Sequence, residues 1–306
     1  HAWTELLPNS TRKQYIVRST GVAEYKTTSG NQIEVERTVY TSMVPQGFEE
    51  FMYFTDQEAP IHQIGGKGVF AKEVQNAVLE NRADFAVHSL KDLPSTTPDG
   101  LQLIAVPRRG DPRDALVGSS LDELPIGGNV ATGSVRRKAQ LSALRPDLTF
   151  HELRGNIETR LAKAENFDAI IISAVALARL GLQPKTIEIL EPEIMLPQVG
   201  QGALGIEART KDLKTIEFLL QIQDPVTRTE IDAERSFLAQ IGADCKSPIA
   251  CYAIHEHSQI RLRSLVANED GETILTDDRT GDDATDLGEF AANALIERGA
   301  RRLFQP

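Results

Sequence analysis

Apolar strands alternate with helical segments over residues 83–182, and this alternation constrains the fold more than any other feature. The clearest strand is Asp168–Ser173, a continuous apolar run of the kind found in sheets covered on both faces. Strands that alternate with helices in this way form parallel βαβ units. The pattern predicts an α/β fold, and 306 residues are enough for two or three domains of ordinary size.

The flanking segments predict additional elements. Residues 14–44 are rich in β-branched residues around Ser29–Asn31, which predicts an antiparallel hairpin. A helix over 225–241 begins at Asp224-Pro225 and ends at Gly242. Two segments rich in Gly, Pro or charge, 107–114 and 195–209, predict crossings between domains. The C-terminal part combines a small antiparallel sheet over 249–276 with a helix over 285–298.

The charge balance limits the possible partners. The chain carries 33 basic and 44 acidic residues, a net charge of −11, which argues against a general binder of nucleic acid or membrane surfaces. No apolar run approaches the roughly 20 residues of a membrane span, and no secretory signal is present. The two cysteines, Cys245 and Cys251, form no disulfide framework, which favours a reducing compartment. We expect a cytoplasmic protein, or one of an organelle stroma or matrix if the N-terminus, which begins at His1, is processed.

Polar residues follow the short apolar strand Phe85–Val87 at the point where it ends. His88, Lys91 and Asp92 lie there, and open α/β sheets bind ligands beyond the carboxyl ends of their strands. A carboxylate next to an ammonium group can serve catalysis, but the same residues also suit a solvated turn. His88 suits a general base or a buried core residue, so this segment alone leaves both alternatives open.

Five arginines fall at or just after predicted strand ends: Arg136, Arg137, Arg154, Arg160 and Arg179. Guanidinium groups bind carboxylates through two parallel hydrogen bonds and keep their charge at any working pH. Any one of them could be a surface cation paired with an acidic neighbour. Five at successive junctions of an acidic chain favour a pocket for a ligand with several carboxylates.

Other candidate sites are weaker. Gly65–Gly68 precedes a helix but lacks the Walker spacing of a phosphate-binding loop. The histidines and cysteines show no zinc-ligand spacing, so we expect no metal. Cys245 lies in a predicted loop next to Lys246, which could lower its pKa and favour nucleophilic use, although a free cysteine is more often a buried apolar residue.

Taken together, these motifs resemble the hydroxymethylbilane synthase (porphobilinogen deaminase) family. The matching stretches run in family order over about residues 60–306: Ile64–Phe70, Val87–Pro94, Asp111–Ala115, Ser134–Arg137, Arg154–Arg160, Leu177–Leu182, Val199–Glu207, Ala233–Leu238 and Asp244–Ile249.

The resemblance implies an architecture of three domains. Two are doubly wound α/β domains like those of periplasmic binding proteins, and the third is a small C-terminal α/β domain. We expect domain 1 at residues 1–105 with 198–220, domain 2 at 106–197, and the C-terminal domain at 221–306. The family acts in haem and chlorophyll biosynthesis. It condenses four porphobilinogen units head to tail, with loss of ammonia, on a dipyrromethane primer.

The resemblance also implies roles for individual residues. Cys245 matches the cysteine that holds the dipyrromethane cofactor through a thioether, and Asp92, with Lys91 beside it, matches the catalytic carboxylate. Residues expected to bind the cofactor are Ser134, Arg136, Arg137, Arg154 and Gln201. Residues expected to bind the substrate are Lys67, Arg136, Arg160 and Arg179. The implied partner is porphobilinogen, and we expect a monomer unless the N-terminal segment binds another protein.

The first sixty residues depart from the family pattern. The family begins with a strand ending in Thr-Arg-x-Ser-x-Leu-Ala and a long helix, whereas Ile16–Gly21 is the nearest match here and the hairpin follows. One hypothesis is therefore an active synthase with a remodelled N-terminus. The alternative is a catalytically silent homologue that serves as a tetrapyrrole-binding or structural subunit. An extracellular solute-binding protein shares the two-lobed fold, but the third domain and the missing signal argue against it.

Overall fold

The computed structural model describes residues 15–26, 32–43, 69–243 and 247–304. The chain forms two compact units, each built from segments that are distant in sequence. The first unit comprises His1–His88, Thr97–Arg108 and Gly205–Asp224. The second comprises Ser89–Thr96, Arg109–Leu204 and Pro225–Pro306.

The first unit contains a three-stranded sheet between two helices. The strand order is β3-β10-β4, and β10 runs antiparallel to β4. Leu219 of one helix packs with Ile104 and Ile206 on the sheet, while Val78 of the other packs with Ala86 and Leu101. The bounds are α1 Val69–Leu79, β3 Phe85–Ser89, β4 Leu101–Ala105, β10 Leu204–Arg209 and α5 Leu213–Leu220.

A separate two-stranded sheet lies at the N-terminal end of the described chain. Strands β1, Tyr15–Lys26, and β2, Gln32–Met43, pair antiparallel in continuous register from Tyr15↔Met43 to Lys26↔Gln32. The hairpin predicted from the β-branched residues is therefore confirmed, while its turn at 29–31 lies outside the described residues.

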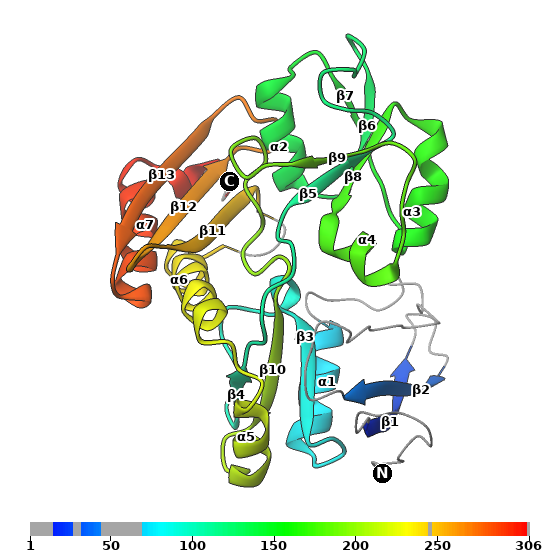
Figure 1. The fold of residues 1–306 in the computed structure, drawn as a ribbon, viewed down its shortest axis with the longest axis vertical. Coiled ribbons are helices and arrows are strands. Elements are labelled where there is room, and N and C mark those ends of the chain that lie inside the picture. The colour runs from blue at the N-terminus through cyan, green and yellow to red at the C-terminus, as the bar shows by residue number, and fades with distance from the viewer. Residues whose placement is uncertain (1–14, 27–31, 44–68, 244–246, 305–306) are drawn as a thin grey trace. The chain divides into compact units, whose positions relative to one another are not determined.

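The second unit contains a five-stranded sheet with helices on both faces, as Figure 1 shows. The order is β7-β6-β8-β5-β9; β6 runs parallel to β7 and β8, and β5 runs antiparallel to its two neighbours. Leu141 of α2 packs on one face, and Leu177 of α4 packs on the other together with Ile157 of α3. The bounds are β5 Asp114–Val117, β6 Asn129–Ala131, α2 Val135–Leu144, β7 Thr149–His151, α3 Ile157–Lys163, β8 Ala169–Ser173, α4 Ala174–Leu180 and β9 Ile187–Leu190.

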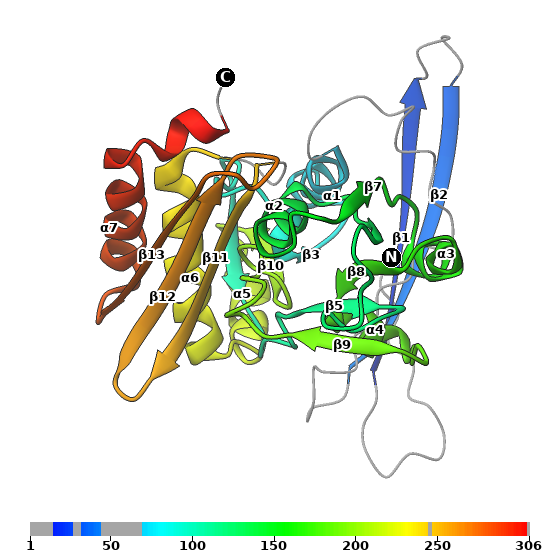
Figure 2. The same ribbon diagram turned by 90° about the horizontal axis from the view of Figure 1, so that it is seen from above.

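The same unit carries a three-stranded antiparallel sheet whose side chains alternate between two cores. Figure 2 shows α6 and α7 beside this sheet, and Phe237 and Leu295 of these helices pack with Cys251 and Val266. The opposite face packs on α2, where Ala139 meets the strands. The bounds are α6 Pro225–Ile241, β11 Ile249–Glu256, β12 Gln259–Ala267, β13 Ile274–Gly281 and α7 Ala284–Glu297.

Most predicted elements agree with the structure. The α/β class and the small C-terminal α/β part are confirmed, and so is the helix over 225–241. Asn156 is the N-cap of α3, where its side chain accepts from the Thr159 N–H. The sequence did not predict β5, β9 and α5, and it interpreted the segment that contains β10 only as a crossing. The three-domain boundaries remain a prediction beside the two units that the contacts define.

Candidate active site

Strand β3 ends in a 3-10 turn, Leu90–Asp92, that carries the two residues proposed for catalysis. Leu90 is 1% exposed and anchors the turn, and its N–H donates to Ala203 O at 3.0 Å. Gly200 permits this close packing: its φ is +71°, and a Cβ there would lie 2.9 Å from a Leu90 methyl carbon. The turn is therefore held by the loop at 198–203, with Lys91 half-buried and Asp92 exposed.

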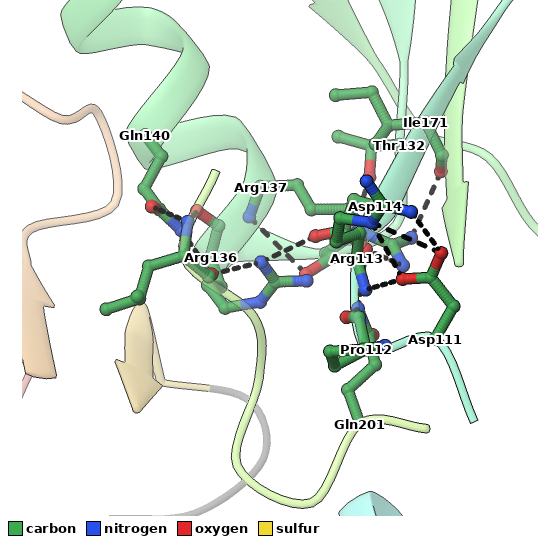
Figure 3. Close-up of polar contacts among 12 residues, drawn as sticks. Asp111, Pro112, Arg113, Asp114, Thr132, Arg136, Arg137, Gln140, Ile171 and Gln201 are labelled. Atoms are coloured by element: carbon green, nitrogen blue, oxygen red, sulfur yellow. Dashed lines mark hydrogen bonds and ion pairs between the residues drawn. The ribbon is translucent and has the colours of Figure 1, made fainter. Parts of the chain in front are cut away.

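The centre of the site is Asp114, the first residue of β5, whose side chain is fully buried. Arg137 donates to its Oδ1 from Nε and Nη2 at 3.0 and 2.8 Å, and Gln201 Nε2 donates to the same oxygen at 2.8 Å. Arg136 Nη1 lies 2.8 Å from Oδ2. Figure 3 shows these three side chains converging on Asp114.

Arg136 and Arg137 place two positive charges in the first turn of α2, and the Asp114 carboxylate compensates for them. The partial positive charge of a helix N-terminus disfavours cations, and the first turn of α2 contains no acidic residue. Burial alone raises the pKa of Asp114, but Arg136 and Arg137 outweigh it, and the pKa falls to about 2. Asp114 is therefore an anion at neutral pH that neutralises part of the charge on the two arginines.

Arg136 keeps one edge of its guanidinium group open. Its Nη1 donates to Leu196 O at 2.7 Å in addition to facing Asp114. Among the described residues, its Nε and Nη2 have no hydrogen-bond partner, although Arg136 is only 2% exposed. Nε and Nη2 form the fork that binds a carboxylate through two parallel bonds. A buried, unpaired fork has high affinity for an anion, because leaving buried donors unsatisfied is costly.

Lys91 adds a titratable cation to the group of side chains around Asp114. Desolvation lowers its pKa to about 8; Asp92 and Asp114 oppose the shift, and Arg137 and Arg136 reinforce it. The ammonium group is therefore only partly protonated near pH 8, and it can bind an anion or exchange a proton.

The structure brings some of the predicted residues together and leaves others apart. Lys91, Arg136, Arg137 and Gln201 surround Asp114, and Asp92 follows Lys91 in the turn. Ser134 acts as the N-cap of α2, where its hydroxyl accepts from the Arg137 N–H.

The other three predicted arginines occupy different surroundings. The Arg154 side chain is 83% exposed and pairs with Glu152 at 3.0 Å. Arg160 is half-buried and donates from Nε to Gly155 O. Arg179 donates to Gly202 O at 3.1 Å, beside Gln201, and burial lowers its pKa. Lys67 and Cys245 lie outside the described residues.

Sequence reasoning missed a buried ion pair that supports the loop at 198–203. Arg109 donates to both carboxylate oxygens of Glu234, at 2.6 and 3.2 Å, and also to Gln201 O at 2.9 Å. Glu234 accepts in addition from the N–H groups of Gly200 and Ala253, at 2.7 and 3.0 Å. Glu234 lies in a helix where a carboxylate is normally a surface residue, so local pattern alone gives no sign of its burial. Asp114 and Glu234 both fall in stretches that match the family, Asp111–Ala115 and Ala233–Leu238, and that resemblance was the available signal.

In the part of the chain that the structure describes, no group of three or more His, Cys, Asp or Glu residues is arranged to hold a metal ion. No helix of the described residues is long and apolar enough to cross a membrane.

Comparison with known proteins gives a consistent result. A family model described as "Porphobilinogen deaminase, dipyromethane cofactor binding domain" matches residues 54–217, and one described as "Porphobilinogen deaminase, C-terminal domain" matches 228–297. The porphobilinogen deaminase of Brevibacillus brevis is 45% identical over 79% of this chain and 81% of the relative. That of Roseiflexus castenholzii is 44% identical over 80% and 83%.

A likeness to the solved structure of YhfZ from Shigella flexneri has a TM-score of 0.26 at 15% identity, covering 63% of this chain and 84% of that one, and the assignment does not rest on it. The identity to the two deaminases extends over most of each chain, and the resemblance inferred from the motifs is confirmed. The chain belongs to the porphobilinogen deaminase family.

Proposed function

We propose that this chain is an active hydroxymethylbilane synthase, whose remodelled N-terminus leaves the chemistry intact. Family membership makes it a transferase of tetrapyrrole biosynthesis with porphobilinogen as substrate and dipyrromethane as cofactor. The observation that carries the proposal for the site is the buried, unpaired fork of Arg136 in a cationic cluster that also includes Arg137 and Lys91. Such a cluster suits molecules that bear acetate and propionate groups.

The residues present fit a dipyrromethane group. Its carboxylates require buried donors that the protein itself does not satisfy, and the Nε and Nη2 groups of Arg136 are two such donors among the described residues. Cys245 would hold the group covalently, and Arg136, with Lys91 beside it, would hold its carboxylates. When bound, the group supplies the free pyrrole carbon from which the chain of pyrrole units grows.

Asp92 and the cationic residues have different tasks in this proposal. As the C–N bond of the aminomethyl group breaks and its nitrogen leaves as ammonia, the methylene carbon stays on the ring and positive charge develops on the pyrrole nitrogen. The exposed carboxylate of Asp92 stabilises this charge and accepts a proton. Arg137 and Gln201, both bonded to Asp114, keep the pocket in shape. Arg154 would bind a carboxylate of the cofactor, and Arg160, Arg179 and Lys67 would bind the carboxylates of incoming units.

The covalent cofactor gives a direct test. Intact-mass measurement of the purified protein should show an added dipyrromethane, and Cys245→Ala should lose it. Cys251→Ala is the matched control, because Cys251 is buried in β11, where burial raises its pKa well above the usual value. A wild-type protein that carries no added mass and consumes no porphobilinogen would instead support the catalytically silent subunit.

The titration of Lys91 predicts a pH dependence. Because its pKa is about 8, the ammonium group loses its proton as the pH rises through that value, and attraction for substrate carboxylates weakens. We expect KM for porphobilinogen to increase above pH 8 in the wild type and to be high but insensitive to pH over this range in Lys91→Met. Steady-state kinetics from pH 6.5 to 9.5 measure this, with exposed Lys211→Met as the control that keeps the wild-type profile. The same rise in Lys91→Met would assign it to another group.

We also propose a monomer that works in the cytoplasm or, after processing, in an organelle stroma or matrix. The monomer is the state that the family resemblance implies, and the two cysteines favour a reducing compartment.

A further inference from the structure

Gln140 lies one helical turn after Arg136 on α2 and is 5% exposed. Its amide group pairs with both main-chain groups of Leu196, much as a neighbouring strand would. The Leu196 N–H donates to Gln140 Oε1 at 2.8 Å, and Gln140 Nε2 donates to Leu196 O at 3.1 Å. A single side chain thus fixes the position and the orientation of this peptide segment against the helix.

The carbonyl that Gln140 holds is also the one that orients Arg136. Leu196 O accepts from Arg136 Nη1 at 2.7 Å and from Gln140 Nε2, so one oxygen serves two donors from the same face of α2. In Figure 3, Arg136 lies between Gln140 and Asp114. Its Nη1 is therefore held from two directions, by Leu196 O and by the Asp114 carboxylate.

This arrangement determines which edge of the guanidinium group stays available. With Nη1 occupied on both sides, the planar group cannot rotate to present another pair of donors without breaking a buried bond. Nε and Nη2 remain without a partner among the described residues. Pre-organised donors of this kind bind more tightly, because no side-chain freedom is lost when the ligand arrives.

Leu196 depends on Gln140 because it lies in the long connection between β9 and β10, outside regular structure. The neighbouring main-chain bonds are made by Met195 N–H to Glu191 O and by Cys251 N–H to Pro197 O. Leu196 packs its side chain with Ala139, the residue before Gln140. Hydrogen bonds from α2 therefore hold the connection at Leu196, and Gln140 contributes two of them beside the one from Arg136.

We propose that Gln140 is a positioning residue for Arg136: it holds Leu196 O so that the Nε–Nη2 edge of Arg136 faces a ligand carboxylate. This proposal rests on the proposed function, in which that carboxylate belongs to the dipyrromethane cofactor.

The test compares Gln140→Met, which keeps the volume but removes both amide bonds, with Leu141→Val. Leu141 is the adjacent residue of α2 and packs on the sheet at β5 and β6, so its truncation weakens the helix packing without touching Leu196. The full-length apo-protein is incubated with porphobilinogen, and the rate of covalent cofactor loading is followed by intact mass. Separately, modification of Arg136 by phenylglyoxal is followed by peptide mass mapping, and thermal unfolding reports stability.

We expect cofactor loading to be about tenfold slower in Gln140→Met than in Leu141→Val. The free energy of about one hydrogen bond that orients Arg136 is lost, and it corresponds to a factor of this size. Modification of Arg136 should accelerate about tenfold, since Nη1 is released. Equal loading and equal modification in the two variants would overturn the proposal. If Gln140→Met does not fold, Gln140→Glu keeps the acceptor for the Leu196 N–H, and its carboxylate should occupy Arg136 and slow loading as strongly; wild-type loading in that variant contradicts the proposal.

Cofactor loading and phenylglyoxal modification together distinguish a failure of this proposal from a failure of the proposed function. A wild-type protein that never loads the cofactor refutes the function, and phenylglyoxal modification then decides the role of Gln140 by itself. A wild type that loads, with Gln140→Met matching Leu141→Val in both readouts, refutes only the positioning role.

Discussion

Replacing Asp114 with asparagine should lower the free energy of unfolding by about 3–5 kcal/mol, the usual cost of removing one partner from a buried ion pair. The variant leaves two buried guanidinium groups facing a neutral amide, and one amide cannot accept the four contacts that Asp114 receives from Arg136, Arg137 and Gln201. Urea denaturation followed by circular dichroism measures the loss. Cofactor loading should fall with it, because the open edge of Arg136 depends on the same contact.

The matched control for this variant is Asp232→Asn, which breaks a part-exposed pair with Arg228 on α6. Such i,i+4 pairs contribute about 0.5 kcal/mol or less. The pH dependence has a defined sign: the folded-state pKa of Asp114 is depressed to about 2, so its stabilisation is complete above about pH 4 and disappears as the pH falls toward 2. A loss below 1 kcal/mol in Asp114→Asn would show that the arginines do not depend on this carboxylate.

Replacing Asp92 with asparagine should lower kcat by about 10²–10⁴-fold while the covalent cofactor remains attached, because general acid–base groups contribute factors of this size. Asp92 is exposed, so the free energy of unfolding should change by no more than about 0.5 kcal/mol. Release of ammonia from porphobilinogen measures turnover, and intact mass measures the adduct. Loss of activity without loss of stability or cofactor distinguishes a catalytic role from a structural one.

The control for Asp92→Asn is Asp99→Asn, an exposed carboxylate seven residues later that contacts none of the predicted pocket residues in any described interaction. It should retain wild-type turnover. If Asp92→Asn also turns over porphobilinogen at a near-normal rate, the catalytic carboxylate must be sought elsewhere in the pocket.

The sequence predicted the parts of the fold that local patterns encode. Apolar strands such as Ala169–Ser173 and a helix with a Pro at its first position, Pro225–Ile241, carry their signals within a few residues. Strands β5 and β9 are only four residues each, too short for a period to emerge. They become strands because β5 pairs with β8 and β9 pairs with β5. Their formation depends on contacts between distant residues.

The sequence likewise predicted some residues of the candidate site and not the contacts that hold them together. Arg136, Arg137 and Lys91 could be named because cations after strand ends in an acidic chain are unusual, and the structure places them around one carboxylate. The role of Asp114 depends on residues 22 and 87 positions away, which no local pattern can report. For Arg154 the carboxylate-binding role stays a prediction, since its described partner is Glu152.

The buried Glu234 carboxylate connects two segments of the second unit that are distant in sequence. It accepts from the N–H of Gly200, in the loop at 198–203, and from the N–H of Ala253, in strand β11. Opening either segment leaves the same charge short of donors, so both open together as one cooperative unit. We therefore expect a destabilising substitution in α6 or β11 to loosen the loop at 198–203 and strand β11 together.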